Sequence, residues 1–559
     1  MAASQSSVRV TRDPQTKAYC SSVTQSMPEP RDCTVFQLLL DGVAFDDAHV
    51  CFAETKSGRE LTLGSLRLQA QQLGLGLLRE GLKPGDVVML LLPNSIAFVV
   101  VLLATQFAGL RCALANPGYM AKELKHVHDL VQPRKIFTTT TLMKNLMRSG
   151  LSWNKAVTVD QSIGRGGARF LKDLMVSEEQ AKQAEPFIPQ SFNETTYLPF
   201  SSGTTGMPKG VEISHKNVAA MVNTLVSIPD GLGRGEKTIG FLPFFHAMAL
   251  LIAVHCTIVN RGKVFIIPGF EPVAFAELVK KEKISNIGLV PPVLNVLAIH
   301  PKITKEHFAS VRYASCGAAP LDADTQRKFS EKTGIWDVRQ GWGMTETTVG
   351  CFGLSQGAEI GTVGRIMPGC YARLVDPDTG KDVEQGERGE VWVRGENITK
   401  GYYRNAEATK GTFSDDGQWL KTGDVGVMND KNEMRIVDRI KELIKYKGWQ
   451  VAPAELEGLL LTHPKVMAAA VIGVYSKEQA TELPRAFKIT PGSDADATAQ
   501  EIIDFVKAKT SPQKYLRGGV RVLDVVPVSP SGKVLRKELR KLVEAEEAAA
   551  AGKEPQAKL

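Results

Sequence analysis

Apolar runs of two kinds alternate through the first two thirds of the chain, and this alternation constrains the fold more than any other feature. From about residue 60 to 340, short strand-like runs are each followed by a helix-like run. Strands that alternate with helices in this way form parallel sheets whose faces are covered by the helices. The clearest pairs are 237–242 with the stretch from His246, 263–267 with 272–283, and 285–290 with 291–299.

The chain changes character twice after this region. Between Gly361 and Val437, short strands are separated by frequent turns, which predicts an antiparallel sheet or distorted barrel beside the α/β layers. Beyond Arg439, helix-like and strand-like runs mix over roughly a hundred residues, which is a usual domain size. The pattern therefore predicts an α/β protein with a large N-terminal domain over 1–437, a small mobile α+β C-terminal domain over 438–541 and a flexible tail over 542–559.

Composition excludes several classes of protein. Hydrophobic residues make up 43% of the 559 residues and charged residues 23%, as in proteins that bury a core. The net charge of +8 is spread over 68 basic and 60 acidic residues, so we expect no nucleic-acid partner. The 8 cysteines include no CxxC pair, which argues against a disulfide scaffold or a zinc knot.

No segment predicts insertion into a membrane. The most apolar stretch, 87–115, is interrupted by Pro93-Asn94-Ser95. A buried strand followed by a buried helix explains this pattern better than a transmembrane segment. The first ten residues contain no apolar h-region, so we expect no secretion signal.

Residues 201–210 read SSGTTGMPKG and carry the strongest functional signal. Glycines let backbone N–H groups turn toward an anion, and hydroxyls can donate to phosphate oxygens or bind Mg²⁺. Lys209 adds a compact positive charge. No Gly-Lys-Ser/Thr follows at the spacing of a Walker A loop. An ordinary surface turn is the alternative, but the order of residues favours a phosphate-binding loop.

Five further segments support this interpretation because they follow in a fixed order. They are CGAAP (316–320), QGWGMTET (340–347), WLKTGD (419–424), 437–457 and 527–540. Together with 201–210 they resemble the AMP-forming acyl-CoA synthetases of the adenylate-forming superfamily. The stretch KELIKYKGWQVAPAELE (441–457) is most similar to the 4-coumarate:CoA ligase-like branch.

The resemblance implies an ATP-dependent carboxylate–CoA ligase that works through an acyl-adenylate, with ATP, Mg²⁺ and coenzyme A as cofactors and a small carboxylic acid as substrate. Attack of a carboxylate on the α-phosphate of ATP brings negative charges together. Catalysis of that step must therefore consist mostly of positioning and electrostatic stabilisation.

By the same resemblance, the nucleotide contacts fall on short segments far apart in the chain. Glu346 and Thr204 would hold Mg²⁺, and Thr345 would contact the α-phosphate. Asp424 and Arg439 would bind the ribose. The phosphate loop would contribute Ser201, Ser202, Gly203, Thr204, Thr205, Gly206 and Lys209, and the adenine would be walled by Gln340, Gly341 and Trp342. For single residues, a turn position for Asp424 and a helix N-terminal acid for Glu346 are the alternatives.

Lys533, in Ser531-Gly532-Lys533, is the residue on which catalysis would depend most. In the family this lysine bridges the acyl carboxylate and the α-phosphate during adenylation; an exposed lysine in a basic stretch is the alternative. The second step would need the small domain to rotate at a hinge near Asp438–Arg439. Contacts to the acyl-adenylate and to CoA would then come from Lys441, Lys445, Lys447 and Gly448.

The acyl pocket is the part in which the chain departs from its relatives. Met248 stands where hydroxycinnamate ligases carry an aromatic residue, and Gly269 replaces a lysine that contacts CoA. Methionine is apolar and adaptable, so we expect a medium-chain or an aryl or arylalkanoic acid. By resemblance the pocket would be lined by His246, Met248, Ala318, Gly341, Gly343 and Val349.

Three other functions fit parts of the same pattern. They are an adenylation enzyme that loads a carrier protein, a luciferase-like oxidase, and a nucleotide-binding regulator without turnover. The tripeptide Ala557-Lys558-Leu559 differs by one small residue from the Ser-Lys-Leu peroxisomal address. We therefore expect a peroxisomal import receptor as partner and a peroxisomal location, with the cytoplasm as the alternative.

Overall fold

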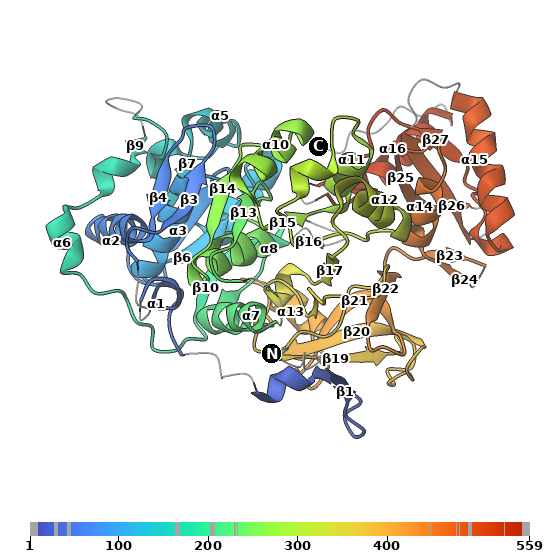
Figure 1. Ribbon diagram of the computed structural model, residues 1–559, viewed down its shortest axis with the longest axis horizontal. Helices are drawn as coiled ribbons and strands as arrows, with labels where there is room; N and C mark the ends of the chain where they lie inside the picture. The colour runs from blue at the N-terminus through green and yellow to red at the C-terminus, as the bar shows by residue number, and fades with distance from the viewer. Residues whose placement is uncertain are drawn as a thin grey trace.

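The structure is a computed structural model and describes residues 9–26, 32–41, 46–162, 168–201, 207–228, 231, 233–447, 449–476, 478–479, 481–489, 495–529 and 532–550. Helix-covered sheets form the larger part, an antiparallel sheet lies below them, and a smaller α+β part lies to the right (Figure 1). This arrangement confirms the predicted fold class.

The first sheet has a parallel centre. Its order is β11-β10-β6-β5-β7-β8-β9, with β12 paired to β10. The parallel strands are β5 (Val87–Leu91), β6 (Arg111–Leu114), β7 (Lys135–Thr138), β8 (Ala156–Thr158), β9 (Arg169–Phe170) and β10 (Thr195–Ser201). Two short antiparallel strands, β11 (Lys209–Gly210) and β12 (Ile213–Ser214), complete it.

The apolar stretch 87–115 forms a strand, a helix and a second strand, as expected. All five residues of β5 are buried, and α3 (Ile96–Phe107) buries eleven of its residues. Ser95 begins this helix, since its side chain accepts a hydrogen bond from the backbone N–H of Phe98. α3 packs against α2 (Leu63–Arg79), and α4 (Ala121–Val131), α5 (Thr140–Arg148) and α6 (Glu178–Lys182) follow in the same half. Among the described residues, no helix has the length and apolar character that crossing a membrane requires.

Two further sheets carry the strands that surround the site. The second has the order β13-β14-β3-β4 and the third the order β15-β16-β17-β18. Their parallel strands are β13 (Lys237–Gly240), β14 (Lys263–Ile266), β3 (Val50–Glu54), β15 (Asn286–Leu289), β16 (Tyr313–Cys316) and β17 (Val338–Trp342). The antiparallel edges are β4 (Glu60–Thr62) and β18 (Phe352–Gly353). One outer face is covered by α10 (Pro272–Glu282), α11 (Pro291–Ile299) and α12 (Ala323–Thr333).

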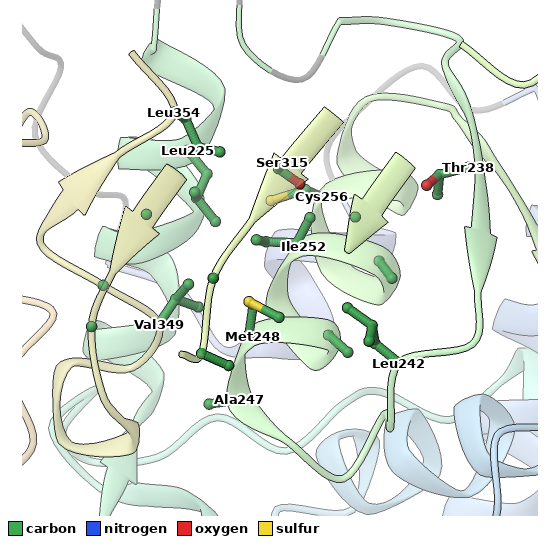
Figure 2. Close-up of a pocket in the computed structure, with 18 of the residues that line it drawn as sticks. Leu225, Thr238, Leu242, Ala247, Met248, Ile252, Cys256, Ser315, Val349 and Leu354 are labelled. Atoms are coloured by element: carbon green, nitrogen blue, oxygen red, sulfur yellow. The ribbon is translucent and has the colours of Figure 1, made fainter. Parts of the chain in front are cut away.

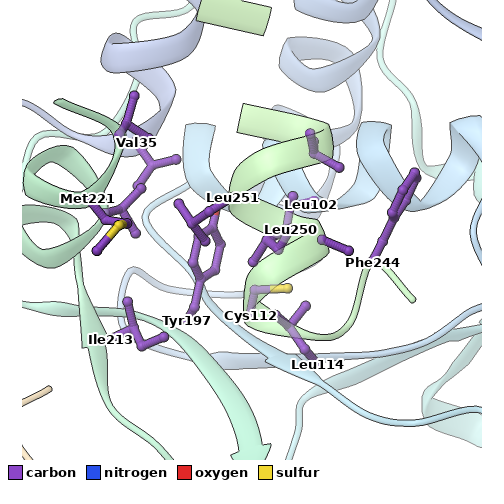
Figure 3. Packing of buried hydrophobic residues seen from close by; sticks show 14 of the residues in the cluster. Val35, Leu102, Cys112, Leu114, Tyr197, Ile213, Met221, Phe244, Leu250 and Leu251 are labelled. Atoms are coloured by element: carbon purple, nitrogen blue, oxygen red, sulfur yellow. The ribbon is translucent and has the colours of Figure 1, made fainter. Parts of the chain in front are cut away.

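A helix with a π-helical centre fills the space between these sheets. It runs from α8 (Ala247–Ala249) through the π segment Leu250–Cys256 to α9 (Thr257–Val259). Leu250 and Leu251 pack with α1 (Val35–Leu40), α3 and α7 (His215–Ser227) in the main core (Figure 3). Within that core the phenolic oxygen of Tyr197 lies 2.9 Å from Nε2 of His255. Burial lowers the pKa of His255 to about 4, so the ring is neutral, and Tyr197 provides it with a hydrogen-bond partner.

The region between Gly361 and Val437 forms an open antiparallel sheet among the described residues. Its order is β1-β2-β19-β20-β21-β22, so the distorted barrel expected there is not closed. The strands are β1 (Val10–Arg12), β2 (Tyr19–Ser21), β19 (Cys370–Val375), β20 (Arg388–Gly395), β21 (Leu420–Met428) and β22 (Met434–Arg439). Beside it lies α13 (Ala406–Thr412).

The C-terminal part has its own sheets and core. A hairpin of β23 (Ile444–Tyr446) and β24 (Trp449–Val451) precedes the sheet β25-β26-β27. The remaining elements are α14 (Pro453–Leu461), β25 (Ala468–Ser476), β26 (Thr481–Ile489), α15 (Ala495–Lys509), β27 (Val520–Val522) and α16 (Arg536–Ala550).

A buried ion-pair network joins the start of α16 to the rest of this part. The guanidinium of Arg536 lies 2.8 Å from Glu442 and 2.7 Å from Glu457, and the three side chains are 10%, 13% and 14% exposed. The second oxygen contact to Glu457 makes that pair bidentate. The network fixes α16, and with it the segment that precedes the helix, against α14 and β25.

We predict that Arg536→Ala lowers the free energy of unfolding by about 3–5 kcal/mol, because two carboxylates would remain buried without their cation. Urea unfolding of the full chain, followed by circular dichroism, measures this change. Lys537→Ala is the matched control, since Lys537 is exposed on the same turn and should change stability by less than about 0.5 kcal/mol. Equal effects of the two substitutions would contradict the prediction.

Candidate active site

The phosphate loop connects two paired strands. Ser201 ends β10 and pairs with Lys209 at the start of β11, so the two ends of the phosphate loop lie side by side. Five predicted site residues, Ser202, Gly203, Thr204, Thr205 and Gly206, lie outside the described residues. The ammonium of Lys209 lies 4.7 Å from the centre of the Tyr402 ring, a distance typical of a cation–π contact.

Tyr402 connects Lys209 of the loop to Glu346, and no sequence motif identified it. Its hydroxyl donates a hydrogen bond of 2.8 Å to Oε1 of Glu346. Burial, followed by the neighbouring Glu346, raises the pKa of Tyr402, so the phenol keeps the proton that it donates. The tyrosine is fixed beside the loop by a bridge to Val211. Only the fold brings residues so distant in the sequence together.

Glu346 has the surroundings of a carboxylate that could hold a hard cation. It lies in the short turn Thr345–Thr347 after β17 and is 4% exposed. One oxygen accepts from Tyr402, and no other hydrogen bond to the carboxylate is found among the described residues. Carboxylate oxygen is the ligand type that Mg²⁺ prefers, so the donor chemistry fits that ion.

Three of the predicted nucleotide-binding residues contact one another directly. The indole N–H of Trp342 donates a 2.8 Å hydrogen bond to Oδ2 of Asp424, and Nε of Arg439 lies 3.0 Å from Oδ1. Asp424 and Arg439 face each other across β21 and β22. Trp342 therefore orients the carboxylate of Asp424. Gln340 lies nearby on β17 and donates to Gln326 at 3.1 Å.

Lys533 reaches this cluster from the C-terminal part. Burial, and next the charge of Arg439, lower its pKa to about 8, while Asp424 opposes the shift. The segment that carries it is a tight hairpin, closed by a bridge between Val528 and Val534.

Gly532 explains how that hairpin approaches the larger part so closely. Its φ is +80°, and an added Cβ would lie 3.1 Å from Pro292 and 3.4 Å from Val290. Only glycine takes both this backbone conformation and this contact at low cost. The hairpin is thus seated against the start of α11.

His246 lies between Lys533 and the acyl side of the site. Burial, and next the charge of Lys533, lower the pKa of His246 to about 4, so the imidazole is neutral near pH 7. The residue precedes α8 and is the first side chain of the pocket described below. Lys533 and His246 therefore lie where the nucleotide-binding side of the site meets the acyl pocket.

The remaining basic residues of the C-terminal part lie apart from this cluster. Lys441, Lys445 and Lys447 are exposed, and the last two belong to the β23–β24 hairpin. The backbone N–H groups of Lys445 and Lys447 donate to Glu482 and Thr481 at 2.7 Å. Gly448 lies outside the described residues. In this arrangement Lys533, and not the hairpin, faces the nucleotide residues.

All six predicted acyl-pocket residues line one cavity. Met248 and Val349 face each other across it, with Ile252 and Cys256 further along the helix (Figure 2). Gly343 is required for packing, because an added Cβ would lie 2.2 Å from the backbone of Val349 and Gly350. Ala318, at φ +70°, Gly341 and Thr345 complete the end nearest His246.

The cavity also includes residues that the sequence did not identify. Thr238, Gly288 and Ser315 come from three parallel strands and line the deeper half. Strands buried on both faces carry apolar residues in nearly continuous runs, so the sequence does not reveal which residues face a cavity.

Comparison with known proteins identifies the family. The family described as AMP-binding enzyme matches residues 42–403, and that described as AMP-binding enzyme C-terminal domain matches residues 455–533. The chain is 33% identical to the probable 4-coumarate–CoA ligase 1 of Dictyostelium discoideum over 551 residues, which cover 94% of this chain and 97% of that protein.

Two other similarities extend this result. The peroxisomal OPC-8:0-CoA ligase 1 of Arabidopsis thaliana is 33% identical over 500 residues, which cover 88% of this chain and 90% of that protein. ATP-bound MatB of Rhodopseudomonas palustris superimposes with a TM-score of 0.81 at 28% identity, covering 92% of this chain and 99% of that chain. This chain therefore belongs to the AMP-binding enzyme family, as an AMP-forming acyl-CoA ligase similar to the 4-coumarate–CoA ligases.

Proposed function

We propose that the chain activates a medium-chain or an aryl or arylalkanoic acid with ATP and transfers the acyl group to CoA, and that Lys533 is the residue on which the first step depends. The observation that supports this is the position of Lys533 beside Asp424 and Arg439 on one side and His246 on the other. A cation at that point can neutralise both anions that must meet.

In the first step the substrate carboxylate attacks the α-phosphorus of ATP and pyrophosphate leaves. Lys209 and the N–H groups of the phosphate loop bind the departing phosphates, and Thr345 contacts the α-phosphate. Asp424, oriented by Trp342 and Arg439, accepts hydrogen bonds from the ribose hydroxyls. Neutral His246 lies near the carboxylate without adding a charge. Positioning and charge compensation then account for the catalysis.

The second step needs the C-terminal part to move, because Lys533 occupies the approach to the acyl-adenylate. We propose that the mobile domain is 438–541, with 542–559 as a tail, and that it turns about Asp438–Arg439. Asp438 is suited to a hinge, since it accepts hydrogen bonds from the N–H groups of Arg439 at 2.7 Å and Ala454 at 3.1 Å. Rotation would bring Lys447 and Gly448 to the pantetheine arm of CoA, and Lys441 and Lys445 to the acyl-adenylate.

We predict that Lys533→Ala lowers the rate of acyl-adenylate formation on the order of a hundred- to a thousand-fold, as loss of a preorganised charge contact does. Thioester formation from supplied acyl-adenylate should be largely retained. Pyrophosphate release and thioester formation measured separately test this difference. Lys537→Ala serves as control, and equal loss of both half-reactions would contradict the role of Lys533.

The pH profile provides a second measurement of the same prediction. A lysine with a pKa of about 8 loses its charge as the pH rises through that value, so kcat/KM for adenylation should fall on the alkaline side. Arginine keeps its charge throughout this range. If Lys533→Arg retains measurable activity, its alkaline decrease near pH 8 should be absent; an unchanged profile would contradict the assignment.

We also propose that Glu346 holds Mg²⁺, with Thr204 as a second ligand. The bound ion would add positive charge at the phosphates. Loss of groups around a metal commonly costs about 10–100-fold in affinity, so Glu346→Gln should raise the Mg²⁺ concentration for half-maximal pyrophosphate release by at least that factor. Glu407→Gln, on the exposed side of α13, is the control. An unchanged Mg²⁺ requirement would exclude Glu346 as a ligand.

Finally, we propose that Ala557-Lys558-Leu559 binds a peroxisomal import receptor. These residues lie outside the described ones, and the support is their sequence together with the peroxisomal relative. A fluorescent protein fused to the N-terminus of the full chain should co-localise with a peroxisomal marker, and deletion of the three residues should abolish this. Retained co-localisation after deletion would refute the proposal, and Lys553→Ala controls for a general effect on the tail.

A further inference from the structure

The sheet wall of the acyl cavity is built in layers. In neighbouring parallel strands, residues two apart point to the same face. Ile239, Ile287 and Ala314 point to the outer core. The residues that precede and follow each of them in its strand therefore point to the opposite face, toward the cavity. Three layers result: Gly240, Gly317 and Gly341 near His246; Thr238, Gly288 and Ser315 next; and Glu236, Asn286 and Tyr313 deepest.

In the uppermost layer, Gly317 and Gly341 present no side chain to the cavity and leave it open along their strands. From Gly240 to Glu236 the chain advances four residues, or about 13 Å at the rise of a strand. The opposite wall is the helix that begins after His246, and it presents Met248, Ile252 and Cys256 (Figure 2). An extended apolar chain can therefore run from the reacting end deep into the protein.

The deepest layer closes the cavity with groups that satisfy one another. Glu236 pairs with Arg312 and accepts hydrogen bonds from the amide of Asn286, the hydroxyl of Tyr313 at 3.3 Å and the N–H of Gly233 at 2.9 Å. Because its charges are paired, this floor offers neither a free anion nor a free cation among the described residues. A second charged group on the substrate would thus find no partner there.

The middle layer differs from both, because its hydroxyls are unpaired. Neither Thr238 nor Ser315 has a hydrogen-bond partner among the described residues, and both face the cavity (Figure 2). Their strands, β13 and β16, lie on either side of β15. At Gly288 of β15 an added Cβ would lie 3.6 Å from the Ser315 oxygen, whereas no atom of Thr238 lies within 4 Å of it. A plain alkyl chain at this layer would exclude water from the hydroxyls and leave them unpaired, which costs binding energy.

We propose that the preferred acid carries a neutral oxygen, as a hydroxyl or oxo group, part-way along an otherwise apolar chain, and that the hydroxyl of Ser315 or of Thr238, which lie on opposite sides of Gly288, hydrogen-bonds this oxygen. The inference rests on the proposed function and names the substrate class of the same site. A pocket that pairs a substrate hydroxyl discriminates against the analogue that lacks it. Met248 and Ile252 hold the apolar part between that oxygen and the carboxylate.

The test compares matched acids. Octanoate, decanoate and dodecanoate are assayed by pyrophosphate release against their mono-hydroxy and mono-oxo derivatives, with the oxygen moved carbon by carbon. At one position the oxygenated acid should exceed its plain counterpart in kcat/KM by about tenfold, the value of one hydrogen bond. A ratio of one or less at every position would overturn the inference.

Variants assign the effect to the two hydroxyls. At least one of Ser315→Ala and Thr238→Val should bring that ratio toward one, whereas Ser57→Ala, on an exposed turn outside the cavity, should preserve it. Gly288→Ala adds a methyl group at ordinary contact distance from Ser315 and Leu242, so it should fold and narrow the cavity, lowering kcat/KM for the oxygenated acid. A ratio unchanged in both hydroxyl variants would contradict the proposal.

The outcome separates this inference from the proposed function. If plain alkanoates release pyrophosphate without any preference for oxygen, only the inference fails. If no carboxylic acid at all supports pyrophosphate release from ATP by the folded wild-type chain, the ligase function fails and the inference falls with it. Melting temperatures of the variants confirm that any loss of preference occurs in folded protein.

Discussion

The arrangement of the site depends on the electrostatic interaction of Lys533 with the nearby Asp424, Arg439 and His246. A lysine at this depth loses hydration, which lowers its pKa to about 8, and only the nearby Asp424 and Glu442 oppose that shift. The charged form of Lys533 is therefore disfavoured in the free enzyme and becomes favoured once the anionic reactants bind. The Arg536 network and Gly532 hold the hairpin against the larger part, so the cation is already placed before the reactants bind.

The other half of the site is organised around aromatic side chains that hold carboxylates. Tyr402 donates to Glu346 and contacts Lys209, while Trp342 donates to Asp424. Each carboxylate has one oxygen fixed by its aromatic donor, which leaves less reorganisation for the moment of reaction. Trp342 thus determines how Asp424 is oriented, besides the surface that it offers to a base.

Much of the fold could be predicted because hydrophobic period and length identify strands and helices locally. The pairs 263–266 with 272–282 and 286–289 with 291–299 appear within a residue or two of expectation. The acyl-pocket residues also came together, because the order of motifs defined a family. Tyr402 could not be found in this way, since its contacts with Lys209 and Glu346 join segments distant in sequence. The cavity residues Thr238, Gly288 and Ser315 could not be predicted, because the sequence of a buried parallel strand does not reveal which of its faces borders a cavity.

The π-helical segment Leu250–Cys256 has a consequence for how this protein can diverge. One side of the helix packs Leu250, Leu251 and Val254 into the main core, and the other presents Met248, Ile252 and Cys256 to the substrate. An inserted or deleted residue in a regular helix would turn everything beyond it by about 100°, so the side chains that now line the cavity would no longer face it. Substrate preference can thus change by point substitution, whereas a change of length has to be absorbed within the helix, as a π segment absorbs an extra residue.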